Sequence, residues 1–120
     1  MDHKVSRIVP HFTSRDLEKS KAFYLAFLGL ELAMDMGWIL TFASRENPEV
    51  QISALKRESN MEQAGTFSIT MEVSAIDQIY HRALAAGYQI PYPLTPESWG
   101  VRRFHIIDPN GVLLNIMSHQ

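Results

Sequence analysis

The chain of 120 residues contains no cysteine. This absence excludes disulfide bonds and every metal site built on thiolates. The sequence also has no apolar run near the roughly 18 residues of a membrane-spanning helix. Its first residues lead into a strand pattern and not into the apolar stretch of a signal peptide. We therefore expect a cytoplasmic protein.

An excess of positive charge is missing as well. The formal net charge is −2 at pH 7, and acidic and basic residues are interspersed along the chain. A protein that neutralises phosphates needs a basic stripe or patch, so nucleic acid is not an expected partner. What is present is 46% hydrophobic residues, enough to build a core in a single domain of residues 1–120.

The sequence falls into two halves that share an order of features. Asp16 is placed as a helix N-cap and Gly29 as a helix C-terminal glycine. Ser74 and Gly87 hold the same places in the second half, with Asp77 completing a capping box. The distance from cap to glycine is 13 residues in both halves, and the offset between the halves is 58 residues. The pattern predicts helices at about residues 16–28 and 74–86.

Strand patterns surround both expected helices, one before each helix and three after it. Each half is therefore a βαβββ module, the first spanning about residues 5–57 and the second about residues 65–119. Two such modules predict an α+β fold in which a curved mixed sheet has helices on its convex face and a concave ligand cavity. The expected strands are residues 8–13, 31–34, 38–43 and 50–55, then 66–73, 89–92, 102–107 and 112–117.

Three segments resemble a known superfamily. They are residues 16–30, residues 74–87, and the run from Trp99 to Gly111 with its Asp-Pro-Asn-Gly turn. Together they are similar to the glyoxalase/bleomycin resistance protein/extradiol dioxygenase superfamily, also called vicinal oxygen chelate. The resemblance is nearest to the bleomycin-resistance-like, metal-free branch, because the last strand carries Asn115 where a metal enzyme of the family has Glu.

The resemblance also marks four positions at which metal-dependent members carry a ligand. They fall on Val9, Ser53, Ser68 and Asn115, which offer no carboxylate and no imidazole. Divalent ions in such enzymes need several charged or imidazole ligands. We therefore expect no metal, no cofactor and no catalytic residue. A shift in strand register that brings in His11 or Gln51 is the way in which a metal site could still arise.

The expected ligand site lies on the concave face. Trp38 and Trp99 stand at the entrance of matching strands and would supply flat aromatic walls. If the turn at residues 108–111 closes a simple hairpin, Ile107 pairs with Val112 and one face collects the side chains of strand residues 102, 104 and 115. Three alternatives stay open: His11 as a structural histidine, Arg102 paired with Glu97, and both tryptophans in the core. The expected ligand-binding residues are His11, Trp38, Ser53, Ser68, Trp99, Arg102, Phe104 and Asn115.

The resemblance implies a function at three levels. The first is a non-metal small-molecule-binding protein that sequesters an organic ligand, as drug-resistance proteins do, and acts as a homodimer. The second is a metal-dependent lyase or isomerase similar to lactoylglutathione lyase, or a dioxygenase. The third is a structural or regulatory module with a vestigial pocket.

Overall fold

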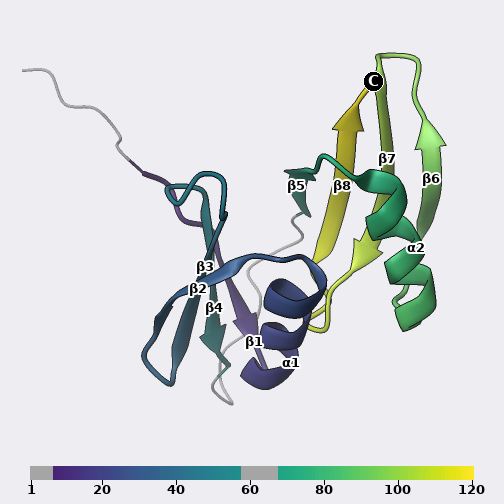
Figure 1. The fold of residues 1–120 in the computed structure, drawn as a ribbon. Coiled ribbons are helices and arrows are strands. Elements are labelled where there is room, and N and C mark those ends of the chain that lie inside the picture. The colour runs from purple at the N-terminus through teal and green to yellow at the C-terminus, as the bar shows by residue number, and fades with distance from the viewer. Residues whose placement is uncertain (1–6, 58–67) are drawn as a thin grey trace, which may run out of the picture. The chain divides into compact units, whose positions relative to one another are not determined.

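A computed structural model describes residues 7–57 and 68–120 of the chain. They belong to two compact units, Met1–Gln63 and Ala64–Gln120. Each unit has one helical segment and four strands in the order βαβββ (Figure 1). The fold is therefore α+β with two four-stranded mixed sheets, as the repeat in the sequence predicts. Within the described ranges, no helix has the length and apolar character needed to cross a membrane.

The sheet of the first unit has the strand order β1-β4-β3-β2. Strand β1 runs parallel to β4, and the other two pairs are antiparallel. A parallel neighbour requires a long crossover, and the helical segment after β1 begins that crossover. The strands are β1 (His11–Ser14), β2 (Glu31–Asp35), β3 (Ile39–Ala43) and β4 (Gln51–Lys56).

The helical segment of the first unit begins as the sequence predicts. Asp16 is the N-cap of α1 (Leu17–Lys21), and its carboxylate accepts from the backbone N–H groups of Glu18 and Lys19. The helix continues as a π-helical stretch, η1 (Ala22–Phe27). Gly29 follows with φ of 78°, a conformation that side chains with a Cβ rarely adopt.

Aromatic rings hold this segment on its sheet. Tyr24 is fully buried and stacks on Phe42 of β3, with 5.1 Å between the ring centroids. It also contacts Phe12 of β1 at 5.3 Å and its neighbour Phe23 at 5.1 Å. Because strand side chains alternate, the face that carries Phe12 and Phe42 is the helix face of this sheet.

The second unit repeats the arrangement with the strand order β5-β8-β7-β6. Strand β5 is parallel to β8, and the other pairs are antiparallel. Its helix α2 (Ile76–Ala86) packs Tyr80 edge-on against the fully buried Phe104, with ring centroids 5.0 Å apart. The strands are β5 (Ser68–Glu72), β6 (Tyr92–Pro96), β7 (Val101–Ile107) and β8 (Leu113–His119).

The start of α2 differs from the predicted capping box. Ala75 occupies the N-cap position and makes no side-chain hydrogen bond there. The Asp77 carboxylate accepts two hydrogen bonds from the Arg102 guanidinium, at 2.7 and 2.9 Å. A bidentate charge-assisted pair is stronger than a neutral hydrogen bond to a cap N–H, which explains why Asp77 does not turn back to Ser74. The C-terminal end agrees with prediction: Gly87 caps the helix with φ of 74°.

Strand β6 begins at Tyr92, where the predicted strand ends. Prolines at positions 91, 93 and 96 break the sequence pattern of a strand, since proline cannot donate to a ladder. The strand order leaves β6 at the edge of its sheet. An edge strand has N–H groups that need no partner in the sheet, so prolines are tolerated there.

The β7–β8 hairpin has a register one residue away from the predicted one. Ile107 pairs with Leu113, not with Val112. The cause is Asp108, whose backbone N–H donates to the Val112 carbonyl and whose carboxylate accepts from the Val112 N–H at 2.8 Å. These bonds hold Val112 inside the turn. A one-residue change of register moves every side chain of one strand to the opposite face relative to its partner.

Candidate functional site

The first sheet presents a polar row on the face away from its helix. His11, Ser53 and Thr41 lie side by side across β1, β4 and β3. The hydroxyls of Ser53 and Thr41 are 2.8 Å apart, and both side chains are buried. His11 is exposed, so the prediction that it shares a face with Ser53 is confirmed, while its alternative role as a buried structural histidine is not.

Trp38 lies in the turn between β2 and β3 and is 55% exposed. The turn is held by a hydrogen bond from the Gly37 N–H to the Asp35 carboxylate, 2.9 Å long. The indole is therefore not a core ring, and its surface is accessible to a ligand or partner. Its participation in a ligand cavity stays a prediction.

The second sheet has its own row away from α2. Asn115 of β8 lies between Thr70 of β5 and His105 of β7. Its Nδ2 donates to Thr70 Oγ1 at 3.3 Å, whereas its Oδ1 is buried and has no hydrogen-bond partner within the described ranges. Ser68, the first residue of β5, is exposed on the same side. That Ser68, Asn115 and the residues of the first unit line a single cavity stays a prediction.

Arg102 and Phe104 do not share this face, so the prediction that places them beside Asn115 is wrong. Phe104 is fully buried against Tyr80 of α2. Arg102 is bound to Asp77 of the same helix, which also excludes the alternative pairing of Arg102 with Glu97. Both errors follow from the register set by Asp108, because the strand side chains alternate between faces.

Arg103 takes the place that was expected for Arg102. Its guanidinium carbon lies 5.3 Å from the ring centroid of Tyr92 and 5.3 Å from that of Trp99. Its Nε donates to Glu97 Oε2 at 2.8 Å, and the Tyr92 hydroxyl donates to the same oxygen at 3.0 Å. His105 contacts the Tyr92 ring, with 5.1 Å between ring centroids. We call these five residues the Arg103 cluster.

The electrostatics of the Arg103 cluster follow from its contacts. The hydrogen bond to Glu97 raises the pKa of the Arg103 guanidinium above its usual value. Burial lowers the pKa of His105, and the positive charge of Arg103 lowers it further. The imidazole is therefore neutral at pH 7, and the Arg103–Glu97 pair balances its own charge. The cluster is a neutral surface of aromatic rings around a single guanidinium.

Sequence reasoning missed four members of the cluster: Tyr92, Glu97, Arg103 and His105. It chose between two adjacent arginines on the register of one hairpin. The available signal was Asp108 itself, since an Asp at the start of a turn commonly binds backbone N–H groups further along it. An Asp108 that caps Val112 adds one residue to the turn and selects Arg103.

Comparison with known proteins follows directly from this architecture. The family model described as "Glyoxalase/Bleomycin resistance protein/Dioxygenase superfamily" matches residues 4–116. The chain belongs to this superfamily. A search of curated proteins found no significant match.

Solved structures of the glyoxalase/bleomycin resistance superfamily share the fold of this member. TioX from Micromonospora sp. ML1 has a TM-score of 0.75 at 20% identity, covering 97% of this chain and 100% of that chain. A glyoxalase/bleomycin resistance protein/dioxygenase from Alicyclobacillus acidocaldarius has a TM-score of 0.70 at 19% identity, covering 99% and 95%. UcmS2 has a TM-score of 0.79 at 20% identity, covering 96% and 98%. At these identities the likeness shows the fold alone.

The side chains of this glyoxalase-superfamily member do not fit a metal ion at the four inferred ligand positions. Val9 has no donor atom, and the Ser53 hydroxyl is hydrogen-bonded to Thr41. Both ends of the Gln51 amide are used, by Arg7 and by the Pro48 carbonyl. Across the residues that the structure describes, no group of three or more His, Cys, Asp or Glu side chains gathers to hold a metal. The neutral amide of Asn115 alone is a weak donor set.

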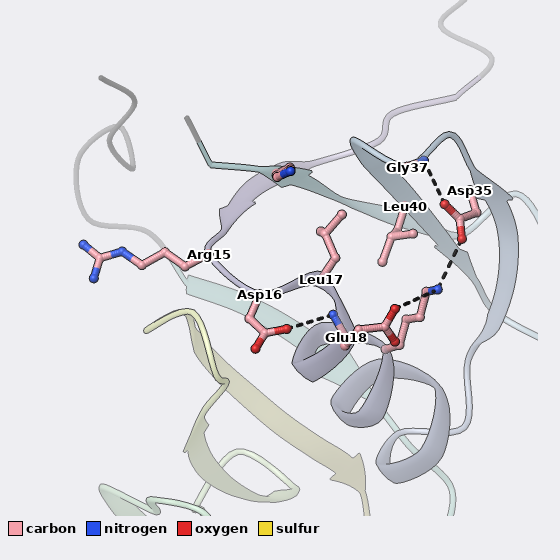
Figure 2. A pocket seen from close by; sticks show the side chains of 9 residues that line it. Arg15, Asp16, Leu17, Glu18, Asp35, Gly37 and Leu40 are labelled. Atoms are coloured by element: carbon pink, nitrogen blue, oxygen red, sulfur yellow. Dashed lines mark hydrogen bonds and ion pairs between the residues drawn. The ribbon is translucent and has the colours of Figure 1, made fainter. Parts of the chain in front are cut away.

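A separate cavity of about 370 Å³ lies in the first unit, on the side of the sheet that carries α1 (Figure 2). Lys21 crosses its wall and binds Asp35 at 3.2 Å and Glu18 at 3.6 Å. The pKa of Lys21 is raised chiefly by its hydrogen bond to Asp35, and the Gly37 N–H and Lys21 lower the pKa of Asp35. None of the predicted ligand-binding residues lines this cavity. Its lining is Arg15, Asp16, Leu17, Glu18, Lys21, Asp35, Gly37, Leu40 and Lys56.

Proposed function

We propose that this superfamily member is a small-molecule-binding protein that holds an organic ligand without a metal ion and carries out no metal-assisted chemistry. The observation that carries the proposal is the donor set at the inferred metal positions. Ser53 already shares its hydroxyl hydrogen bond with Thr41, and Asn115 offers only a neutral amide. Such a set lacks the negative charge that retains a divalent ion.

The chemistry of the competing function explains why the donor set decides between them. A lyase, isomerase or dioxygenase of the metal-dependent type needs an ion that polarises a carbonyl or activates oxygen, and a base that moves a proton. The polar row of the second sheet contains Asn115, Thr70 and a neutral His105. These groups can orient a ligand by hydrogen bonds, and the Arg103 cluster adds aromatic surface for it.

Metal analysis and a ligand screen test the proposal together. Protein expressed with added Ni, Zn, Mn and Fe should carry only substoichiometric metal after desalting, measured by mass spectrometry of the elements. A thermal-shift screen should include quinones, aromatic cations, thiol conjugates and natural-product drugs. A true ligand at 100 times its dissociation constant should stabilise the protein by about 2.7 kcal/mol.

The control variant for that experiment is Asn115→Ala. It should leave the metal content unchanged, because Asn115 holds no ion under the proposal. A stoichiometric metal that disappears in Asn115→Ala would refute the metal-free function and favour the lyase or dioxygenase alternative. A metal-free protein that no compound in the screen stabilises would instead favour the vestigial module.

The second part of the proposal is that the protein acts in the cytoplasm as a homodimer. Strand β2 lies at the sheet edge and all five of its residues are exposed. Met34, Met36 and Trp38 add large apolar side chains that are 40%, 60% and 55% exposed. A flat edge strand beside exposed apolar residues commonly pairs with another chain.

Light scattering at micromolar concentration tests the homodimer. The expected mass is twice the 13.7 kDa of the chain. A Trp38→Glu variant should shift the protein toward the monomer, since a buried charge opposes association. Ile8→Glu is a matched control at another exposed apolar residue that lies outside the β2–β3 hairpin. A wild-type monomer would contradict this part of the proposal.

A further inference from the structure

The guanidinium of Arg103 has hydrogen-bonding capacity that its own unit leaves unused. Guanidinium has five N–H donors in a planar fork. The Nε donor is used by Glu97, while no acceptor within the described ranges takes the Nη donors. The Arg103 side chain is 27% exposed, so a ligand can reach the fork from solvent.

The fork is held in one orientation by three neighbours. Tyr92 and Trp99 lie at equal distances from the guanidinium carbon, 5.3 Å to each ring centroid. Glu97 fixes both Arg103 and Tyr92 through the single oxygen Oε2. The Glu97 side chain is only 12% exposed, so solvent weakens this anchoring little. A positioned donor pair loses less conformational entropy on binding than a mobile arginine does.

An apolar surface lies beside the fork. Trp99 is 63% exposed, so much of its indole remains available beyond its contact with Arg103. Aromatic rings prefer to stack on such a surface. A guanidinium fork accepts planar oxygen groups, either a carboxylate through two parallel bonds or a carbonyl through one or two N–H groups. A cationic group would be repelled by Arg103 and offers no acceptor to the fork.

We infer that the ligand is a flat aromatic molecule that carries a carbonyl or carboxylate oxygen in the plane of its ring. The oxygen is held by the Nη donors of Arg103, and the ring lies on the indole of Trp99. This inference rests on the proposed binding function and names the ligand class of that site. Because Glu97 balances the charge of Arg103, both neutral and anionic oxygen groups belong to the class.

Three probes with the same ring and different polar groups test the ligand class. They are naphthoate, naphthamide and naphthylmethylammonium, titrated into full-length protein and followed by amide and indole N–H resonances in NMR. Naphthoate or naphthamide should bind and shift the Trp99 indole resonance, and the ammonium compound should not. The relative affinities of the first two distinguish an anionic ligand from a neutral one.

Two variants and one control test the residues. Arg103→Lys keeps the charge but removes the fork, so it should weaken binding of the oxygen-bearing probe by on the order of 10-fold. Trp99→Leu should weaken binding of the same probe by a similar factor. Arg102→Lys is the control: it is the adjacent arginine of β7, lies on the helix face and keeps its charge toward Asp77. It should bind the probe as the wild type does.

The outcomes separate this inference from the proposed function. If the ammonium probe binds as well as naphthoate, if Arg103→Lys binds unchanged, or if none of the three probes binds at millimolar concentration, the ligand class is wrong. The binding function then still depends on the metal analysis and the wider screen. If Arg103→Lys does not fold, Trp99→Leu decides, because this exposed side chain contributes little to the core.

Discussion

Replacing Tyr24 by alanine should lower the free energy of unfolding by about 3–5 kcal/mol. Tyr24 is fully buried at the centre of the aromatic group in the first unit. It stacks on Phe42 and contacts Phe12 and Phe23, so its removal leaves a cavity between the helical segment and two strands. Urea denaturation followed by far-UV circular dichroism measures the loss.

The matched control for this change is Tyr24→Phe. It retains the ring and its contacts, and should cost much less than the alanine variant. Because the chain has two compact units, calorimetry should show whether they unfold in one transition or two. A Tyr24→Ala variant within about 1 kcal/mol of the wild type would contradict the importance of this packing, since buried aromatic truncations cost more.

Replacing Asp108 by alanine should cost about 2–3 kcal/mol, because it leaves buried backbone donors without acceptors. The Asp108 carboxylate accepts from the N–H groups of Asn110 and Val112, both at 2.8 Å. Asp108 itself is 4% exposed. The Val112 amide should also exchange its hydrogen faster in the variant. Urea denaturation and hydrogen exchange measured by NMR check the two expectations.

Asp108→Asn is the control for this second change. The Asn side chain keeps an oxygen that can accept from Val112, so most of the stability and the slow exchange should be retained. If Asp108→Ala matches Asp108→Asn in both measurements, the turn does not depend on the side-chain acceptor. The explanation given above for the β7–β8 register would then be incorrect.

Local chemistry made much of the fold predictable. Asp16 caps a helix because its carboxylate reaches the N–H groups of the next turn, and Gly29 and Gly87 end helices because glycine accepts positive φ. These signals act over three or four residues, so they are visible in the sequence. Their repetition at a constant offset predicted two modules of one kind, and the family match agrees with them.

The candidate site was less predictable, because it depends on contacts between distant residues. Ser74 and Asp77 form a correct capping-box pattern, yet Asp77 binds Arg102, 25 residues away. The energy of that ion pair competes with the local cap, and no local pattern reveals it. His11 and Ser53 were placed correctly on one face, since the position of β1 beside β4 follows from the module itself.

The sequence by itself determined the two βαβββ modules, the helix ends and the neutral side chains at the inferred metal positions. Only the tertiary structure decided that Arg103, and not Arg102, lies among aromatic rings on the face of Asn115. The physical reason is the two-residue period of a strand, through which one added turn residue at Asp108 exchanges the faces of two adjacent arginines.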